Sequence, residues 1–226
     1  MHITVLTGAG ISAESGLATF RASDGLWEQH RIEDVATPEA FARDPDLVHG
    51  FYNARRTRAA AAHPNPAHRA LVELARHHDL TLVTQNVDEL HERAGSSDVI
   101  HMHGSLRRAL CAACEHRWDA PAAMSATDPC PRCNKPATRP DIVWFGEMPY
   151  HMERIWQALE AADIFAAIGT SGNVYPAAGF AQHAGRMGAE CLEFNLDDSA
   201  NARDFDRRIH GPASATVPEW VNAICR

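Results

Sequence analysis

The sequence predicts an α/β fold built on a doubly wound parallel sheet, with a helical insertion and a small cysteine-rich module. Short β-branched and aliphatic runs alternate with stretches at helical spacing, as in strands joined by crossover helices. A glycine turn follows the first strand, and polar residues follow four more strands where each ends. Because open parallel sheets bind ligands at their carboxyl edge, we expect a cofactor cleft there.

The first strand is expected at residues 3–6, followed by a glycine turn at residues 7–10. The spacing Gly8-x-Gly10-x-x-Ala13 fits the dinucleotide-binding pattern. Residues 12–15 are expected to open a helix, with Glu14 near its positive end. The free N–H groups of this turn would face a pyrophosphate. A tight turn without a ligand would give the same local pattern.

We expect no strand between residues 28 and 78. Thr37 and Pro38 are typical of a helix N-cap and first helical position. Longer helices are expected at residues 46–61 and 67–76, separated by two prolines. These helices form an insertion between the first strand and the second.

The remaining strands are expected at residues 80–84, 99–102, 164–168 and 191–194. Helices follow these strands, and a last amphipathic helix is expected to begin near Pro218. The polar residues and glycines that follow the five strands are Thr7, Gly8, Gln85, Asn86, Asp88, His103, Gly104, Gly169, Thr170, Ser171 and Asn195.

The composition is that of a globular protein, with 226 residues of which 45% are hydrophobic and 22% charged. No run reaches the roughly 20 apolar residues of a membrane span, and no signal-peptide pattern is found. We therefore expect a cytoplasmic protein without membrane contact. We also expect a monomer. The net charge of −8 argues against nucleic-acid binding and is compatible with a basic, lysine-containing partner.

Four of the six cysteines form two C-x-x-C pairs separated by fifteen residues: Cys111, Cys114, Cys130 and Cys133. This spacing is typical of a zinc site. Four thiolates leave no open position, so the zinc would be structural. Four buried cysteines or two disulfides are the alternatives. A zinc ribbon that binds nucleic acid is disfavoured by the acidic chain.

Residues 8–27, GAGISAESGLATFRASDGLW, closely resemble the opening motif of the sirtuins, the NAD-dependent protein-lysine deacylases. The resemblance extends from Val5 to about Val221 and includes the position of the cysteine module. It implies a Rossmann-like NAD-binding domain at residues 1–28, 79–105 and 140–226. Residues 29–78 would be a helical insertion in the small domain, and residues 106–139 the zinc-binding module.

The resemblance also implies a set of NAD-binding residues. Gln85 and Asn86 would hold the nicotinamide ribose and a water, and Asp88 the nicotinamide amide. Asp88 could equally cap the following helix. The full set is Gly8, Ala9, Gly10, Ser12, Phe20, Arg21, Trp27, Gln85, Asn86, Asp88, Gly169, Thr170, Ser171, Asn195 and Ala213.

Two histidines at the end of one strand compete for the catalytic role. His101 and His103 lie two residues apart and could face the same way, so periodicity does not choose between them. The sequence His103-Gly104-Ser105 resembles the sirtuin His-Gly motif, which implies that His103 is the general base. An imidazole of near-neutral pKa suits proton relay from a ribose hydroxyl.

The acyl-lysine site is also implied by resemblance. Val143 and Phe145 lie in a segment that resembles the edge on which the substrate peptide is added as a strand. Tyr52 and Arg55 resemble the Tyr-x-x-Arg pair of sirtuins that remove succinyl and malonyl groups, and would bind the distal carboxylate. Spacing alone favours a solvated arginine beside a partly buried tyrosine. Arg56 and Arg58 are expected to point elsewhere.

The implied function is NAD-dependent removal of acetyl, succinyl and malonyl groups from lysine in proteins or peptides. Nicotinamide and an O-acyl-ADP-ribose would be released, so NAD would be consumed without hydride transfer. A mono-ADP-ribosyltransferase would use the same cleft but leave ADP-ribose on the protein. An NAD-dependent oxidoreductase is disfavoured, because no acidic residue ends a second strand about 20 residues after the glycine turn.

Overall fold

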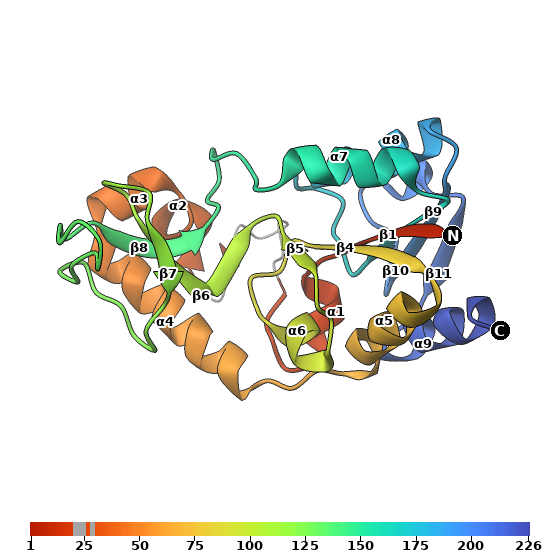
Figure 1. The fold of residues 1–226 in the computed structure, drawn as a ribbon, viewed down its shortest axis with the longest axis horizontal. Helices are drawn as coiled ribbons and strands as arrows, with labels where there is room; N and C mark the ends of the chain where they lie inside the picture. The colour runs from red at the N-terminus through yellow and green to blue at the C-terminus, as the bar shows by residue number, and fades with distance from the viewer. Residues whose placement is uncertain (20–25, 28–29) are drawn as a thin grey trace.

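The computed structural model describes residues 1–19, 26–27 and 30–226. Figure 1 shows two lobes, a larger one built on a twisted sheet and a smaller one that contains helices and a separate small sheet. Both chain termini lie in the larger lobe. Among the described residues, no helix has both the length and the apolar composition that a membrane span requires.

The sheet of the larger lobe has six parallel strands in the order β11-β10-β9-β1-β4-β5. The strands are β1 (His2–Thr7), β4 (Asp79–Thr84), β5 (Val99–His101), β9 (Ile164–Ile168), β10 (Glu190–Asn195) and β11 (Arg207–His210). The five predicted strands are confirmed. The sixth, β11, was not predicted because its sequence, Arg-Arg-Ile-His, is mostly polar, as suits a strand at the sheet edge.

Helices cover both faces of this sheet (Figure 1). One face carries α7 (Met152–Ala161), α8 (Phe180–Arg186) and the 3₁₀ turn Ala177–Gly179, and the other carries α5 (Pro66–His77) and α9 (Ala213–Ile224). The short helices α1 (Ala9–Ala13) and α6 (Leu90–Ala94) follow β1 and β4, and a second 3₁₀ turn, Ala202–Asp204, precedes β11.

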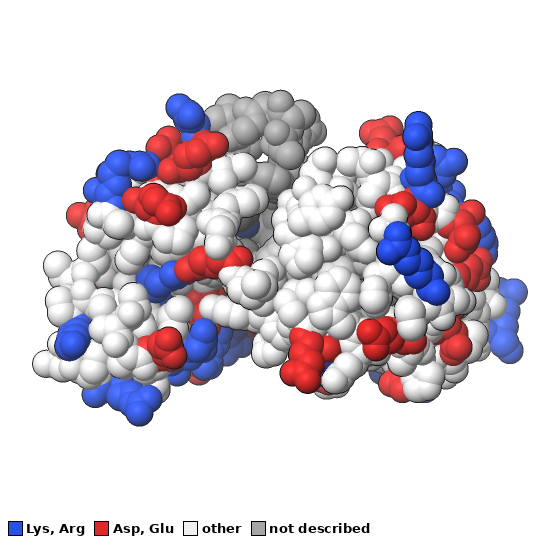
Figure 2. Space-filling model, turned by 90° about the horizontal axis from the view of Figure 1, so that it is seen from above, with Lys and Arg blue, Asp and Glu red and all other residues white. Residues whose placement is uncertain are grey.

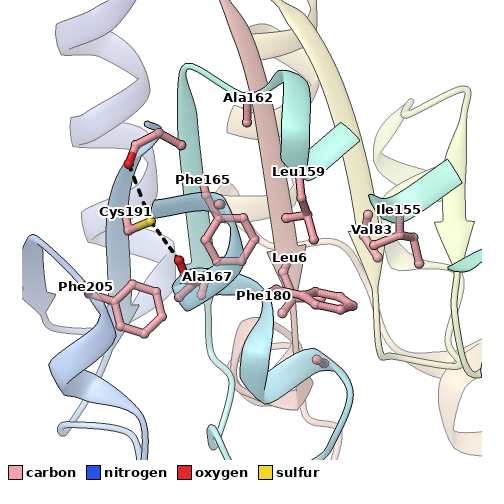
Figure 3. Close-up of a cluster of buried hydrophobic side chains, with 14 of the residues drawn as sticks. Leu6, Val83, Ile155, Leu159, Ala162, Phe165, Ala167, Phe180, Cys191 and Phe205 are labelled. Atoms are coloured by element: carbon pink, nitrogen blue, oxygen red, sulfur yellow. Dashed lines mark hydrogen bonds between the residues drawn. The ribbon is translucent and has the colours of Figure 1, made fainter. Parts of the chain in front are cut away.

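Alternate residues of β1 point into two separate cores, as the pleat of a strand requires. Leu6 belongs to the core under α7 and α8, with Phe165 and Phe180 (Figure 3). Ile3 and Val5 belong to the core under α5 and α9. The sheet is therefore apolar on both faces, as expected for a doubly wound fold.

The last helix begins at Ala213, five residues before the predicted start at Pro218. The N–H groups of Ala215 and Thr216 donate to Pro212 O at 3.0 and 3.1 Å, which closes the first turn. Pro218 lies inside the helix. Proline is common at helix starts, and here that preference gave a start that was too late.

The smaller lobe combines helices with an antiparallel sheet of order β7-β6-β8. Its elements are α2 (Ile32–Val35), α3 (Pro38–Arg43), α4 (Pro45–Ala61), β6 (Gly104–Cys111), β7 (Arg117–Asp119) and β8 (Thr138–Ile142). Thr37 caps α3 as predicted, accepting from Ala40 N at 3.0 Å. β2 (Leu26–Trp27) pairs with β3 (His30–Arg31), which contradicts the expectation of no strand between residues 28 and 78. The strand β3 was missed because two residues are too few to show a periodicity.

Helices α4 and α5, both in the predicted insertion, pack in different places. Phe51 and Tyr52 of α4 lie in the core of the smaller lobe with Trp144, whereas Leu71 and Leu74 of α5 lie under the large sheet. The two prolines that separate the helices thus mark the point where the chain returns to the larger lobe.

Candidate active site

A cleft of about 630 Å³ lies between the carboxyl edge of the large sheet and the smaller lobe, within the usual size of ligand sites. Figure 2 shows the molecule hollowed between its two lobes, with acidic and basic side chains interspersed around the hollow. Of the predicted residues outside the cysteine module, those that line the cleft are Gly8, Ala9, Gly10, Ser12, Tyr52, Arg55, Gln85, Asn86, Asp88, His103, Val143, Phe145, Gly169, Thr170, Ser171, Asn195 and Ala213. Phe20, Arg21 and the side chain of Trp27 lie outside the described residues.

The glycine turn after β1 packs directly against the end of β9. Gly8 N donates to Ile168 O and Gly10 N to Gly169 O, both at 2.9 Å. A Cβ on Gly8 would lie 2.6 Å from Gly169 O, and one on Gly10 would lie 2.6 Å from Gly169 Cα. The expectation of free N–H groups is therefore wrong for these two residues. Their glycines are required first for close contact between two backbones.

Helix α1 also starts earlier than predicted. Gly8 is its N-cap and Ala9 its first residue, whereas the predicted first turn began at Ser12. Glu14 is the C-cap, and its carboxylate accepts from Ser214 N at 2.9 Å and Ser214 Oγ at 2.7 Å. Glu14 therefore interacts with the positive end of α9 instead of that of α1.

The segment after β4 is bonded to this turn. Asn86 Nδ2 donates to Gly8 O at 3.0 Å and Ser12 Oγ at 3.2 Å, and Ser12 Oγ donates to Asp88 Oδ2 at 3.2 Å. Asp88 Oδ1 accepts from Leu90 N at 3.0 Å, so Asp88 both lines the cleft and satisfies the start of α6. Burial raises the pKa of Asp88, and the hydrogen bonds from Leu90 and Ser12 oppose that rise.

His101 donates hydrogen bonds from both ring nitrogens. Its Nδ1 lies 3.1 Å from Asn86 O and its Nε2 lies 2.6 Å from Glu92 Oε1, and both partners are acceptors. Burial alone would lower the pKa of His101, but the hydrogen bond and charge of Glu92 outweigh it, so the pKa is raised. A ring that donates from both nitrogens has no lone pair with which to accept a proton.

His103 has the opposite arrangement. Its Nδ1 lies 3.2 Å from Gln85 O, and because a carbonyl only accepts, Nδ1 carries the proton. The Nε2 atom of the neutral ring then has the lone pair that a base requires. Burial lowers the pKa of His103, with the Gln85 bond opposing, which favours this neutral form. The contacts thus distinguish two histidines that periodicity could not.

The backbone after His103 is held in a conformation that requires glycine. Gly104 has a φ of +80°, and a Cβ there would lie 2.1 Å from Asp141 O. On the same side, Val143 N donates to His103 O at 3.0 Å. The position of His103 is therefore fixed by Val143, directly after β8, as well as by Gln85.

The four predicted cysteine ligands form one cluster, with all four Sγ atoms within 4.8 Å of one another. The Sγ–Sγ distance is 3.6 Å for Cys111 and Cys133 and 3.8 Å for Cys114 and Cys130. A tetrahedral zinc with Zn–S bonds of about 2.3 Å places its sulfurs about 3.8 Å apart. The cysteines are unpaired, which contradicts the disulfide alternative. The cluster fits one structural zinc ion.

A model of the Sir2 family matches residues 8–176, which is more than half of the chain. The chain belongs to the Sir2 family. An NAD-dependent protein deacylase of Bdellovibrio bacteriovorus is 55% identical over 225 residues, covering 97% of this chain and 95% of the relative. The NAD-dependent protein deacylase of Escherichia coli is 53% identical, covering 100% of this chain and 82% of the relative.

Solved Sir2 structures share the whole fold. A Sir2 homologue in complex with NAD superposes with a TM-score of 0.91 at 41% identity, covering 98% of this chain and 88% of the other. A Sir2 complex with a p53 peptide and NAD⁺ superposes with a TM-score of 0.81 at 27% identity, covering 98% and 91%.

In this Sir2 chain, the loops after β9 and β10 are bonded together at one end of the cleft. Asn195 Nδ2 donates to Thr170 O at 2.7 Å, and Ala200 N donates to Ser171 O at 3.0 Å. Ala213, the first residue of α9, lines the same end. The predicted residues of this region therefore come together from three separate segments.

The segment expected to receive a peptide strand already uses several N–H groups internally. Val143 N donates to His103 O at 3.0 Å, Phe145 N to Ala36 O at 2.9 Å, and Trp144 N to Glu147 Oε2 at 2.8 Å. A peptide strand would therefore have to bond to other main-chain groups of this Sir2 segment.

The arginines of α4 that line the cleft are not only the one that was predicted. Arg56 Nε donates to Leu106 O at 2.8 Å and Arg56 Nη1 to Asn53 Oδ1 at 2.7 Å, so Arg56 points away from the cleft as expected. Arg58 lines the cleft with Tyr52 and Arg55, so the expectation for Arg58 is wrong. These three residues are spaced three apart and share one helix face, a signal that was present in the sequence.

Other residues that line the cleft were not predicted as site residues. Asn173, Val174 and Tyr175 extend the predicted loop after β9, and Trp144 lies between two predicted residues. Strict alternation along a strand places Trp144 on the far side from Val143 and Phe145, but all three line the cleft. The remainder of this set is Ala13, Leu17, Ala18, Thr19, Ala36, Ala59, Val87, Leu106, Ile142, Gly146, Glu147, Pro149, Phe194, Leu196, Asp197, Asp198, Ser199, Ala200 and Gly211.

Proposed function

We propose that this chain is an NAD-dependent protein-lysine deacylase that acts on acyl-lysine in proteins or peptides. The observation that carries the proposal is the geometry of His103, whose Nδ1 bonds to Gln85 O and whose side chain lines the cleft. The names of the Sir2 relatives agree with this activity. NAD, when bound, supplies an electrophilic ribose carbon and nicotinamide as leaving group.

The chain's own residues supply orientation and proton transfer. His103 Nε2 accepts a proton from a ribose hydroxyl, and Gln85 O keeps the ring in the required tautomer. Asn86 and Asp88 bind the nicotinamide end of NAD, held by their bonds to Ser12. The loops containing Thr170, Ser171 and Asn195, with Ala213, bind the adenosine end.

We propose that the acyl pocket accepts succinyl and malonyl as well as acetyl groups. Tyr52 and Arg55 both line the cleft and come from one face of α4. The Arg55 Cζ atom lies 5.6 Å from the centroid of the Phe51 ring, which supports the guanidinium from one side. A guanidinium and a phenol are suited to bind the carboxylate at the end of a succinyl group. Val143 and Phe145 would contact the acyl-lysine stem.

The test is turnover of acetyl-lysine and succinyl-lysine peptides with and without NAD, with products identified by mass spectrometry. We expect free lysine, nicotinamide and O-acyl-ADP-ribose, all dependent on NAD. ADP-ribose attached to a peptide or to the protein would support a transferase instead. NAD-independent turnover would overturn the proposal.

The variant Arg55→Met tests the acyl assignment. We expect desuccinylation to fall by about 100-fold, because a charge-assisted bond to the carboxylate is lost, while most deacetylation remains. The measurement is kcat/KM on both peptides. Arg56→Met, on the same helix but directed to Leu106 O, is the control and should leave the ratio of the two activities unchanged. Equal loss of both activities in Arg55→Met would contradict the assignment.

We propose the division of the chain given by the sequence, with one change: α5 is assigned to the NAD-binding domain because Leu71 and Leu74 pack under the large sheet. The monomeric state, the cytoplasmic location and the lack of nucleic-acid binding stay predictions. Size-exclusion chromatography with light scattering would test the first of these.

A further inference from the structure

The hydroxyl of Tyr52, a residue that lines the cleft, has a fixed hydrogen-bond partner. Trp144 Nε1 donates to Tyr52 Oη at 3.0 Å, and the exposed fractions of Tyr52 and Trp144 are 1% and 2%. An indole N–H can only donate, so the tyrosine oxygen must accept. Within the described part of the chain, no acceptor lies within hydrogen-bond distance of the tyrosine O–H. Its proton is therefore left for a group in the cleft.

Trp144 is itself held on its ring face and at its backbone. Arg139 Cζ lies 3.5 Å from the centroid of the indole ring. The same guanidinium donates to Glu147 Oε1 at 2.7 Å and Oε2 at 2.9 Å, and Glu147 Oε2 also accepts from Trp144 N at 2.8 Å. A planar guanidinium that is both stacked and bidentate cannot be replaced by lysine without loss of one contact.

We propose that Trp144, held by Arg139 and Glu147, is a specificity-determining residue that makes Tyr52 a hydrogen-bond donor to the end of the acyl group. Acyl groups that end in an acceptor, such as the succinyl carboxylate, satisfy this buried O–H. Acyl groups that end in a methyl leave it unsatisfied. The inference rests on the proposed deacylase function and adds residues outside the Tyr-x-x-Arg pair to its acyl selectivity.

The test is a double-mutant cycle of Trp144→Phe and Tyr52→Phe, read as the ratio of kcat/KM for succinyl-lysine to that for acetyl-lysine. Trp144→Phe keeps an aromatic ring but removes the N–H. We expect the ratio to fall by about three- to tenfold, the effect of one hydrogen bond. Because both activities come from one preparation, partial misfolding lowers both and cancels in the ratio. Trp118→Phe, in β7 and outside the cleft, is the matched control.

The Tyr52→Phe variant shows whether Trp144 acts by positioning the Tyr52 hydroxyl or only by packing in the cleft. If Trp144 acts through the Tyr52 hydroxyl, Trp144→Phe lowers the ratio in the wild type but has no further effect in Tyr52→Phe. An unchanged ratio in Trp144→Phe, or an equal fall in both backgrounds, overturns the inference. If Trp144→Phe does not fold, Arg139→Lys takes its place in the cycle. The ratio is then measured in the wild-type and Tyr52→Phe backgrounds, and the same results support or overturn the inference. Wild-type protein that does not remove succinyl groups would instead contradict the proposed acyl range itself.

Discussion

At the scale of single residues, hydrogen-bond partners decide which histidine can act as a base. His101 is the last residue of β5 and His103 follows that strand, but His101 bonds to two acceptors and His103 to one. The first is therefore held as a cation beside Glu92, and the second as a neutral ring. Residue type and spacing contain neither piece of information.

The substitution His103→Tyr removes the proposed base without introducing a charge. We expect turnover to fall by at least about 100-fold, the usual contribution of general-base catalysis, while NAD binding is largely retained. Nicotinamide release measures the turnover, and calorimetric titration measures the binding of NAD. His77→Tyr, an exposed position on α5, is the control. A His103→Tyr variant that releases nicotinamide and free lysine at the wild-type rate would disprove the assignment.

At the scale of elements, β6 connects two parts of the site that differ in chemistry. It begins at Gly104, directly after His103, and ends at the zinc ligand Cys111. Its partner β8 contacts Gly104 and leads to the segment 143–147. The cysteine cluster and the proposed catalytic residue His103 therefore lie at opposite ends of one strand.

Gly104→Ala should damage both stability and activity. The backbone is left-handed there and the added Cβ meets Asp141 O, so we expect a loss of about 2 kcal/mol or more in the free energy of unfolding. Urea denaturation measures this loss, and acyl-peptide turnover should fall with it. Gly50→Ala lies within α4 with no atom within 4 Å of the added Cβ, and should gain up to about 1 kcal/mol. Equal effects of the two substitutions would contradict the role given to Gly104.

Loss of zinc should unfold the module around β6 and β7. In Cys114→Ser we expect loss of bound zinc, a melting temperature lowered by several degrees, and little remaining turnover. The reason is that zinc bound by four thiolates stabilises this module in place of a hydrophobic core. Metal analysis and thermal unfolding check the prediction. Cys225→Ser, at the chain end, should retain its zinc. A zinc-free Cys114→Ser protein with wild-type stability would show that the cluster is dispensable.

At the scale of the whole molecule, a buried polar cluster joins helices α5 and α6 to the sheet. The rings of His68 and His91 lie 4.9 Å apart, and His91 Nε2 lies 2.9 Å from Thr7 Oγ1. Burial lowers the pKa of His68 to about 4 and the pKa of His91 well below its usual value. Between pH 4 and 6.5 the unfolded chain therefore binds protons that the folded chain excludes, so stability falls as the pH falls.

His68→Gln tests this dependence. In the wild type, Asn65 N donates to His68 Nδ1 at 3.3 Å. Glutamine at position 68 also offers an acceptor for Asn65 N, but its side chain does not titrate. At pH 8 we expect His68→Gln and the wild type to have nearly equal free energies of unfolding. On going to pH 5, the variant should lose about 2 kcal/mol less of this free energy than the wild type. Urea denaturation at both pH values checks it. His77→Gln, exposed on the same helix, should behave as wild type. Identical pH dependence in His68→Gln and wild type would contradict the proposal.

The sequence predicted the parallel sheet and the cleft because both follow from short-range patterns. Leu80 to Val83 and the following Gln85 and Asn86 show an apolar run and a polar end without reference to the rest of the chain. The start of α9 was missed because the proline that was expected at the helix start, Pro218, lies inside the helix, and because the bond from Ser214 to Glu14, about 200 residues away in the chain, leaves no local pattern. The proposed roles of Trp144 and Arg139 were missed because the partners of these residues are set by tertiary packing.

The central position of β1 has a consequence for biosynthesis. β1 leaves the ribosome before β4 and β9, which are its neighbours in the sheet. The acceptors of the glycine turn, Ile168 O and Gly169 O, emerge only after most of the polypeptide has been translated. The apolar strand Ile3 to Leu6 therefore has no sheet partner early in synthesis, and during that time it is exposed to aggregation.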